Sequence, residues 1–166
     1  MSGPEAGRAA AAAAPLRAMT VGDLDAVMAI ENAVYPFPWT RGNFIDSLAA
    51  GHLARVAGAP DRLVGYYVAM AGVDELHLLN ITVAPAAQRQ GLARRLVGDL
   101  IEHAAGCGAR QVWLEVRTSN AVAQIVYREL GFVRRGVRRD YYPAPRGSRE
   151  DALVMSLDVA PAVGGS

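Results

Sequence analysis

The stretch VAPAAQRQGLARRL, residues 83–96, follows a strand-like apolar segment and leads into a segment with helical periodicity. Its centre, QRQGLA (88–93), combines polar side chains with residues that have little or no side chain. Small residues at this position let a ligand approach the main chain. The free N–H groups and partial positive charge of a helix start attract anions such as phosphate. The stretch therefore predicts either an anion site at the beginning of a helix or an ordinary turn that contains a glycine.

The patterns on both sides of this stretch predict one mixed α/β domain built on a single sheet. Helical periodicity and caps predict helices at 21–35, 40–50, 92–104 and 121–130. Alternating or β-branched runs predict strands at 53–58, 63–72, 75–83, 111–117, 132–142 and 151–159, with a further first strand near 16–19. We expect the domain to span residues 16–159, between a disordered Ala-rich tail at 1–15 and a flexible tail at 160–166.

Composition excludes several classes of protein. The chain has 166 residues and a net charge of +1, so its overall charge gives no reason to expect nucleic-acid binding. Cys107 is its only cysteine, which rules out an intrachain disulfide. No apolar run approaches the roughly 18 residues that span a bilayer, and we expect a soluble, cytoplasmic protein. Its three histidines, at 52, 77 and 103, show no metal-ligand spacing, so no metal site is expected.

A family resemblance decides between the two interpretations of the opening stretch. The residues Val83-x-Pro85-x-x-Gln-Arg-Gln-Gly-Leu-Ala93 resemble the acetyl-coenzyme A pyrophosphate motif of the GNAT acetyltransferases, Gln/Arg-x-x-Gly-x-Gly/Ala. The segments WLEVRTSNAVAQIVYRELGF (113–132) and RRDYYPAPRGSREDALVMSL (138–157) are similar to the RimI-type ribosomal-protein-alanine N-acetyltransferases of that family. One departure is Ala93, where glycine is commoner. The resemblance implies a GNAT fold, whose sheet of six or seven strands, flanked by about four helices, splays between its two middle parallel strands.

The resemblance also implies acetyl-CoA as the co-substrate. Main-chain amides at the helix start would hold its diphosphate, and the preceding strand would pair with its pantetheine arm. Asn120 matches a coenzyme-binding position of the family, although it is also placed to cap a helix. The residues expected to bind the coenzyme are Ile81, Thr82, Val83, Arg89, Gln90, Gly91, Leu92, Ala93, Arg94 and Asn120.

Two residues match the chemical positions of the family. Glu115 stands in an apolar strand, where a carboxylate is unusual, and the resemblance implies that it is the general base. From the strand alone, it is equally a solvent-facing residue or the partner of Arg117. Tyr127 matches the family's proton donor to the coenzyme thiolate, in Val126-Tyr-Arg-Glu-Leu-Gly-Phe132. From the helix alone, it is a core aromatic residue.

The acceptor implied by the resemblance is the N-terminal alanine of a small-subunit ribosomal protein. A peptide tail needs a groove with aromatic walls, and the candidates for these walls are Tyr35, Trp39, Tyr141 and Tyr142. The arginines at 134, 135, 138 and 139 form either a ribosome-facing stripe or a solvated strand face. An acetyltransferase for a small-molecule amine and a non-catalytic acyl-CoA-binding module are the alternative functions. The sequence leaves the oligomeric state open.

Overall fold

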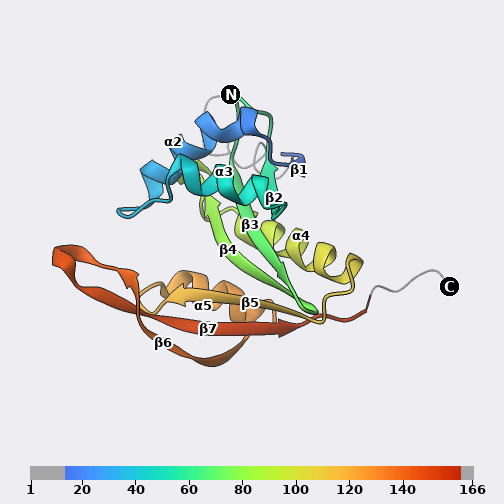
Figure 1. Ribbon diagram of the computed structural model, residues 1–166, viewed down its shortest axis with the longest axis vertical. Coiled ribbons are helices and arrows are strands. Elements are labelled where there is room, and N and C mark those ends of the chain that lie inside the picture. Colours follow the sequence, from blue (N-terminus) through green and yellow to red (C-terminus); the bar gives the residue numbers. More distant parts are fainter. Residues whose placement is uncertain (1–13, 162–166) are drawn as a thin grey trace. The chain divides into compact units, whose positions relative to one another are not determined.

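A computed structural model describes residues 14–161 and contains the predicted elements in the predicted order (Figure 1). The helices are α2 (Leu24–Val34), α3 (Arg41–Ala49), α4 (Leu92–Gly106) and α5 (Ala121–Glu129). The strands are β1 (Leu16–Ala18), β2 (Leu53–Ala57), β3 (Gly65–Gly72), β4 (Glu75–Val83), β5 (Gln111–Arg117), β6 (Val133–Pro143) and β7 (Arg149–Asp158). Most of the predicted tails lies outside the described residues.

The strands form one seven-stranded mixed sheet in the order β1-β2-β3-β4-β5-β7-β6. The β4 and β5 strands are parallel, and their register covers Glu75–Leu78 and Gln111–Leu114. Both strands continue beyond this pairing, β4 to Val83 and β5 to Arg117. A short parallel pairing between two longer strands is the arrangement that the GNAT fold implied.

The chain divides into two compact units, which are described separately. The first contains the residues up to Met70 together with Asn80–Gly98. Its core is formed by side chains at most 2% exposed, from α2, α3, the strands and the start of α4: Leu24, Val27, Phe44, Val56, Tyr66, Val68, Leu92, Leu96 and Val97. Thr40 caps α3, since its Oγ1 accepts from the Asn43 main-chain N at 3.1 Å. The Phe44 ring then packs edge-on against Tyr66 with centroids 5.8 Å apart.

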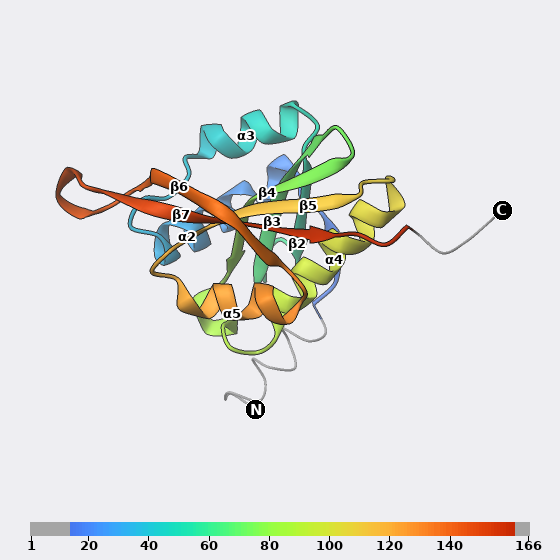
Figure 2. The ribbon, with the colours of Figure 1, turned by 90° about the horizontal axis from the view of Figure 1, so that it is seen from below.

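The second unit contains Ala71–Leu79 and the residues from Asp99 onward. Along β5 the even-numbered side chains Val112, Leu114 and Val116 are buried, while the odd-numbered ones are partly exposed. This alternation is the one predicted for a strand with one apolar face. The β7 strand pairs antiparallel with the whole of β5, from Gln111 to Arg117, and β6 forms the outer edge of the sheet. Figure 2 shows α5 lying along one face of these strands.

Two details of the helices differ from the prediction or refine it. The first predicted helix begins with a short 3₁₀ turn at Val21–Asp23 before α2 starts at Leu24. The α2 helix ends at Val34, one residue earlier than predicted and directly before the segment YPFPW (35–39), whose two prolines cannot continue a helix. None of the helices in residues 14–161 is both long and apolar enough to cross a membrane.

Candidate active site

The helix start predicted to bind an anion is formed as expected. The α4 helix begins at Leu92, and its first helical hydrogen bond joins the Arg95 N–H to the Gly91 carbonyl at 3.2 Å. The N–H groups of Leu92, Ala93 and Arg94 precede this bond, so they point out of the helix start. Gly91 has φ +80°, and a Cβ placed there would meet nothing within 4 Å. Main-chain donors and open space therefore occur together, which is what a diphosphate requires.

The side chain of Gln90 is partly engaged within its own turn. Its Nε2 donates to the Ala86 carbonyl at 3.2 Å, and its buried Oε1 has no hydrogen-bond partner. An oxygen acceptor cannot bind a phosphate oxygen. Toward a diphosphate, Gln90 therefore retains two donors, the second N–H of Nε2 and its main-chain N–H group.

The end of β4, predicted to pair with pantetheine, has two carbonyl oxygens that already accept hydrogen bonds. Tyr35 donates its hydroxyl proton to the Ile81 carbonyl at 2.9 Å, and Gln88 Nε2 donates to the Val83 carbonyl at 3.3 Å. The Thr82 side chain is 2% exposed, and its Oγ1 donates to Asn80 Oδ1 at 2.8 Å. In this segment, the main-chain N–H groups are thus the groups that suit a ligand carbonyl.

A buried glutamate, which the sequence analysis did not single out, connects this strand to the YPFPW segment. Glu31 is 1% exposed and accepts from Tyr66 Oη at 2.6 Å, from Asn80 Nδ2 at 3.1 Å and from the Trp39 main-chain N at 2.9 Å. Burial, followed by the bond to Glu31, raises the pKa of Tyr66 far above its ordinary value. With three donors the carboxylate is satisfied, so it fixes α2, β3, β4 and the end of the 35–39 segment relative to one another.

The two predicted substrate-wall residues of this segment therefore also serve structural roles. Tyr35 uses its hydroxyl to bond Ile81 and lies 2.9 Å from Thr82 Oγ1. The ring of Trp39 packs on Phe44 with centroids 5.1 Å apart. A role of Tyr35 and Trp39 toward an acceptor remains a prediction.

In the second unit, Glu115 lies between an imidazole and a guanidinium group. Its Oε2 is 2.5 Å from His77 Nε2 and its Oε1 is 3.3 Å from Arg138 Nε, with the Glu115 side chain only 6% exposed. Arg117 does not pair with Glu115. It pairs instead with Glu150 at 3.1 Å, so both simple alternatives for Glu115, a solvent-facing residue or the partner of Arg117, are wrong.

The two tyrosines predicted as the other substrate wall lie close to this carboxylate. The Tyr141 and Tyr142 rings meet edge-on with centroids 4.8 Å apart. Burial raises the pKa of both hydroxyls, and the negative charge of Glu115 raises each further. Arg138 stacks over Tyr141 at 5.5 Å and Arg117 over Tyr142 at 4.5 Å. The structure thus brings both tyrosines together with the predicted base, on the outer strand β6.

Tyr127 and Asn120 belong to α5. Tyr127 is 6% exposed and its ring packs against Phe132 with centroids 5.6 Å apart. Its hydroxyl also contributes to raising the pKa of Tyr142, so these two residues are electrostatic neighbours. Asn120 caps the helix, since its Oδ1 accepts from the Ala123 N–H at 3.2 Å. The packing role and the capping role considered for these residues are therefore both present, whereas their roles toward a coenzyme remain predictions.

The sequence-predicted residues divide between the two units. The helix start, Ile81–Val83, Tyr35 and Trp39 belong to the first unit, and Glu115, Asn120, Tyr127, Tyr141 and Tyr142 belong to the second. The sequence analysis missed His77 and Arg138 as neighbours of Glu115. No pattern within a single segment indicates these contacts, because they depend on strand register. The parallel register of β4 and β5 pairs His77 with Trp113, and Glu115 is the next residue of β5 on the same face.

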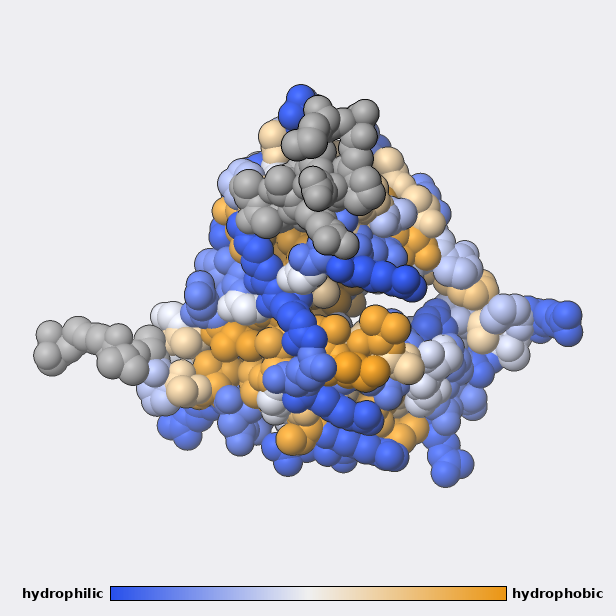
Figure 3. Space-filling model, turned by 180° about the vertical axis from the view of Figure 1, so that it is seen from behind, coloured by the Kyte–Doolittle hydropathy of each residue, from blue (hydrophilic) through white to orange (hydrophobic). Residues whose placement is uncertain are grey.

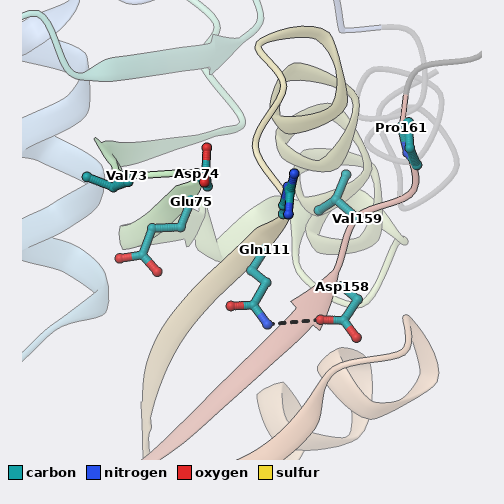
Figure 4. Close-up of a pocket in the computed structure, with 8 residues that line it drawn as sticks. Val73, Asp74, Glu75, Gln111, Asp158, Val159 and Pro161 are labelled. Carbon is teal, nitrogen blue, oxygen red and sulfur yellow. Dashed lines mark hydrogen bonds between the residues drawn. The ribbon is translucent and has the colours of Figure 1, made fainter.

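A pocket of about 570 Å³ lies elsewhere in the second unit, at the starts of β4 and β5 and the end of β7 (Figure 4). Asp74, Glu75, Arg110, Gln111 and Asp158 supply its polar lining, and Gln111 Nε2 donates to Asp158 Oδ1 at 3.0 Å.

Figure 3 shows apolar residues gathered on one face of the molecule among charged ones. In the described part of the chain, no group of three or more His, Cys, Asp or Glu residues could hold a metal ion.

Comparisons with known proteins agree with this architecture. The profile of the Acetyltransferase (GNAT) family matches residues 24–132. The [ribosomal protein bS18]-alanine N-acetyltransferase of Salmonella typhimurium is 38% identical over 138 residues, which cover 83% of this chain and 93% of that protein. Its counterpart from Haemophilus ducreyi is 36% identical over 135 residues, covering 81% and 93% of the two chains.

Similarity to a solved structure extends the comparison to the fold. The crystal structure of the ribosomal-protein-S18-alanine N-acetyltransferase from Escherichia coli matches with a TM-score of 0.81 and 35% identity, covering 92% of this chain and 97% of that one. The profile match, the sequence relatives and the shared fold agree. This chain therefore belongs to the GNAT family of acetyltransferases and is an N-acetyltransferase.

Proposed function

We propose that this enzyme transfers an acetyl group from acetyl-CoA to the free N-terminal α-amine of a protein, and that its substrate is the N-terminal alanine of a small-subunit ribosomal protein. The observation that carries the proposal is the similarity, at 36–38% identity over most of the chain, to enzymes named for acetylating the alanine of ribosomal protein bS18. A ribosomal substrate would place the reaction in the cytoplasm.

The first unit would hold the coenzyme. The N–H groups from Arg89 to Arg94 at the start of α4 would bind the diphosphate, with the space over Gly91 admitting it. The main chain of Ile81–Val83 would bond the pantetheine arm, and the two carbonyls that Tyr35 and Gln88 engage each keep a second lone pair. An N–H group in this strand would also stabilise charge on the thioester carbonyl oxygen.

The second unit would supply the proton transfers. An α-amine is protonated near neutral pH and must lose a proton before it attacks, and Glu115 is the predicted base for that step. Tyr127 would protonate the thiolate that leaves. Tyr141 and Tyr142, beside Glu115, would form a wall for the substrate peptide, and Asn120 would bond the coenzyme while it caps α5.

The proposal is tested with peptides. We expect acetylation of a peptide that begins with the N-terminal sequence of a small-subunit ribosomal protein starting in alanine, and no acetylation of the same peptide with a blocked terminus. Equal acetylation of both peptides would assign the activity to lysine side chains. Transfer only to small amines would favour a small-molecule acetyltransferase. Intact-mass analysis of ribosomal proteins from cells with and without this chain would identify the natural substrate.

A further inference from the structure

His77 contacts the predicted base directly. Its Nε2 lies 2.5 Å from Glu115 Oε2, and the imidazole is 23% exposed where the carboxylate is only 6% exposed. The parallel register of β4 and β5 pairs His77 with Trp113, so Glu115 lies two residues further along β5 on the same face. Two regular strands, and no loop, therefore hold the imidazole against the carboxylate.

Besides His77, one cation and two phenols face Glu115. Arg138 Nε, from β6, lies 3.3 Å from the second carboxylate oxygen. The phenols of Tyr141 and Tyr142, also from β6, are neutral neighbours whose pKa values the Glu115 charge helps to raise. A nearby cation stabilises a carboxylate by direct attraction. Both oxygens of Glu115 are engaged, which suits this residue to hold and orient a partner.

Within the described part of the chain, one ring nitrogen of His77 makes no hydrogen bond, whereas both carboxylate oxygens of Glu115 have a partner. His77 contacts Glu115 through Nε2. Among residues 14–161, its other ring nitrogen, Nδ1, has no hydrogen-bond partner. An imidazole has an ordinary pKa of about 6.5 and a glutamate one of about 4.3, whereas an α-amine has one of about 8. A general base is most effective when its pKa lies near the working pH. By residue type, histidine suits the deprotonation of an α-amine better than glutamate does.

We propose that His77 and Glu115 act as a dyad in which His77 Nδ1 accepts the proton of the α-ammonium group, directly or through one water, and Glu115 orients the ring. This rests on the proposed function and moves the proton-accepting atom from Glu115 to His77 Nδ1, which Glu115 holds in place. As the proton moves to Nδ1, the N–H bond of the ammonium breaks and its electron pair becomes free to attack the thioester carbon. The imidazolium formed is stabilised by the ionised Glu115, in the way a carboxylate supports a histidine base, and it then returns its proton to water.

Kinetics with matched variants test the dyad. His77→Gln keeps a donor toward Glu115 but cannot take up a proton. We expect it to lower kcat/KM by roughly 100-fold or more and to remove the acidic limb of the pH–rate profile, with acetyl-CoA affinity by calorimetry unchanged. Imidazole added to His77→Ala should restore part of the rate. His103→Gln is the control, because His103 faces Asp99 at 3.7 Å on α4 and should leave the profile unaltered.

A second measurement does not depend on activity. Nitrogen NMR of the wild-type protein should show neutral His77 protonated at Nε2, with Nδ1 bare, and Glu115→Gln should lower the pKa measured for the ring. Protonation at Nδ1, or a His77→Gln variant with normal rate and profile, would overturn the dyad. The dyad would also be overturned if His77→Gln lost rate but kept the acidic limb of its pH–rate profile, and imidazole failed to rescue His77→Ala. Absence of transfer by the wild-type enzyme to any α-amine would instead overturn the proposed function.

Discussion

The Glu115 carboxylate and the Arg138 guanidinium group lie 3.3 Å apart, although β7 separates their strands in the sheet. The pairing gives the Glu115 side chain, which is only 6% exposed, a cationic partner on the face of β5 opposite to its buried apolar side chains. Removing the charge should therefore affect chemistry more than folding. The substitution Glu115→Gln is expected to lower turnover by roughly 100- to 10,000-fold while acetyl-CoA still binds.

Steady-state assays with an Ala-initiated peptide, together with calorimetry, measure both quantities. Glu102→Gln, at an exposed position of α4, is the matched control and should retain full turnover. A near-wild-type rate for Glu115→Gln would remove Glu115 from the mechanism in either role, as base or as the partner of His77.

Tyr127→Phe separates the chemical role of this residue from its packing role. The substitution keeps the ring against Phe132, whose centroid is 5.6 Å away, and deletes only the hydroxyl. If the hydroxyl protonates the leaving thiolate, turnover should fall by roughly 100-fold or more and the basic limb of the pH–rate profile should change. Thermal melting should shift little. Normal turnover with an unchanged profile would show that Tyr127 only packs.

A pair of substitutions at Gly91 tests the anion site. The φ of +80° is tolerated by Asn and Asp better than by other side chains, and nothing within 4 Å would contact a new Cβ. Asn and Asp have nearly the same shape and differ in charge. We expect Gly91→Asp to bind acetyl-CoA more weakly than Gly91→Asn by about tenfold, with the difference shrinking as salt screens the repulsion. Equal affinities at low salt, measured by calorimetry, would place the diphosphate elsewhere.

The Glu150 carboxylate should make stability depend on pH. Hydrogen bonds from Ser119 and then from Arg117 lower its pKa from 4.5 to about 2. A carboxylate with a lowered pKa in the folded state stabilises the fold above its unfolded pKa, and this contribution disappears as the pH falls from about 4.5 through about 2.

Glu150→Gln should therefore be less stable than wild type at pH 7, by about 1 kcal/mol or less for a pair near the surface. The two proteins should become equal near pH 2. Urea unfolding at several pH values measures the difference. A gap in stability that stays constant down to pH 2 would contradict this origin.

The sequence was sufficient for the elements and their order. The alternation in 111–117 and the apolar run of 75–83 predicted β5 and β4 with the bounds that the structure shows. The predicted helices 21–35 and 40–50 correspond to α2 and α3, where Thr40 caps the start of α3 and the prolines of YPFPW follow the end of α2. These features are local, because caps, prolines and periodicity act within a few residues of the chain.

The contacts around the candidate base came only from the tertiary structure. His77 lies 38 residues before Glu115 in the chain, and Arg138 lies on β6, a later strand. The sequence analysis noted only that His77 shows no metal-ligand spacing and that Arg138 belongs to a group of four arginines. Glu31 likewise gathers Tyr66, Asn80 and Trp39 from three separate segments. Such contacts depend on strand register and on which element lies beside which, and no periodicity within one segment encodes them. The sequence by itself therefore determined the fold and the turn at the start of α4, whereas only the folded chain decided which charged groups surround the Glu115 carboxylate.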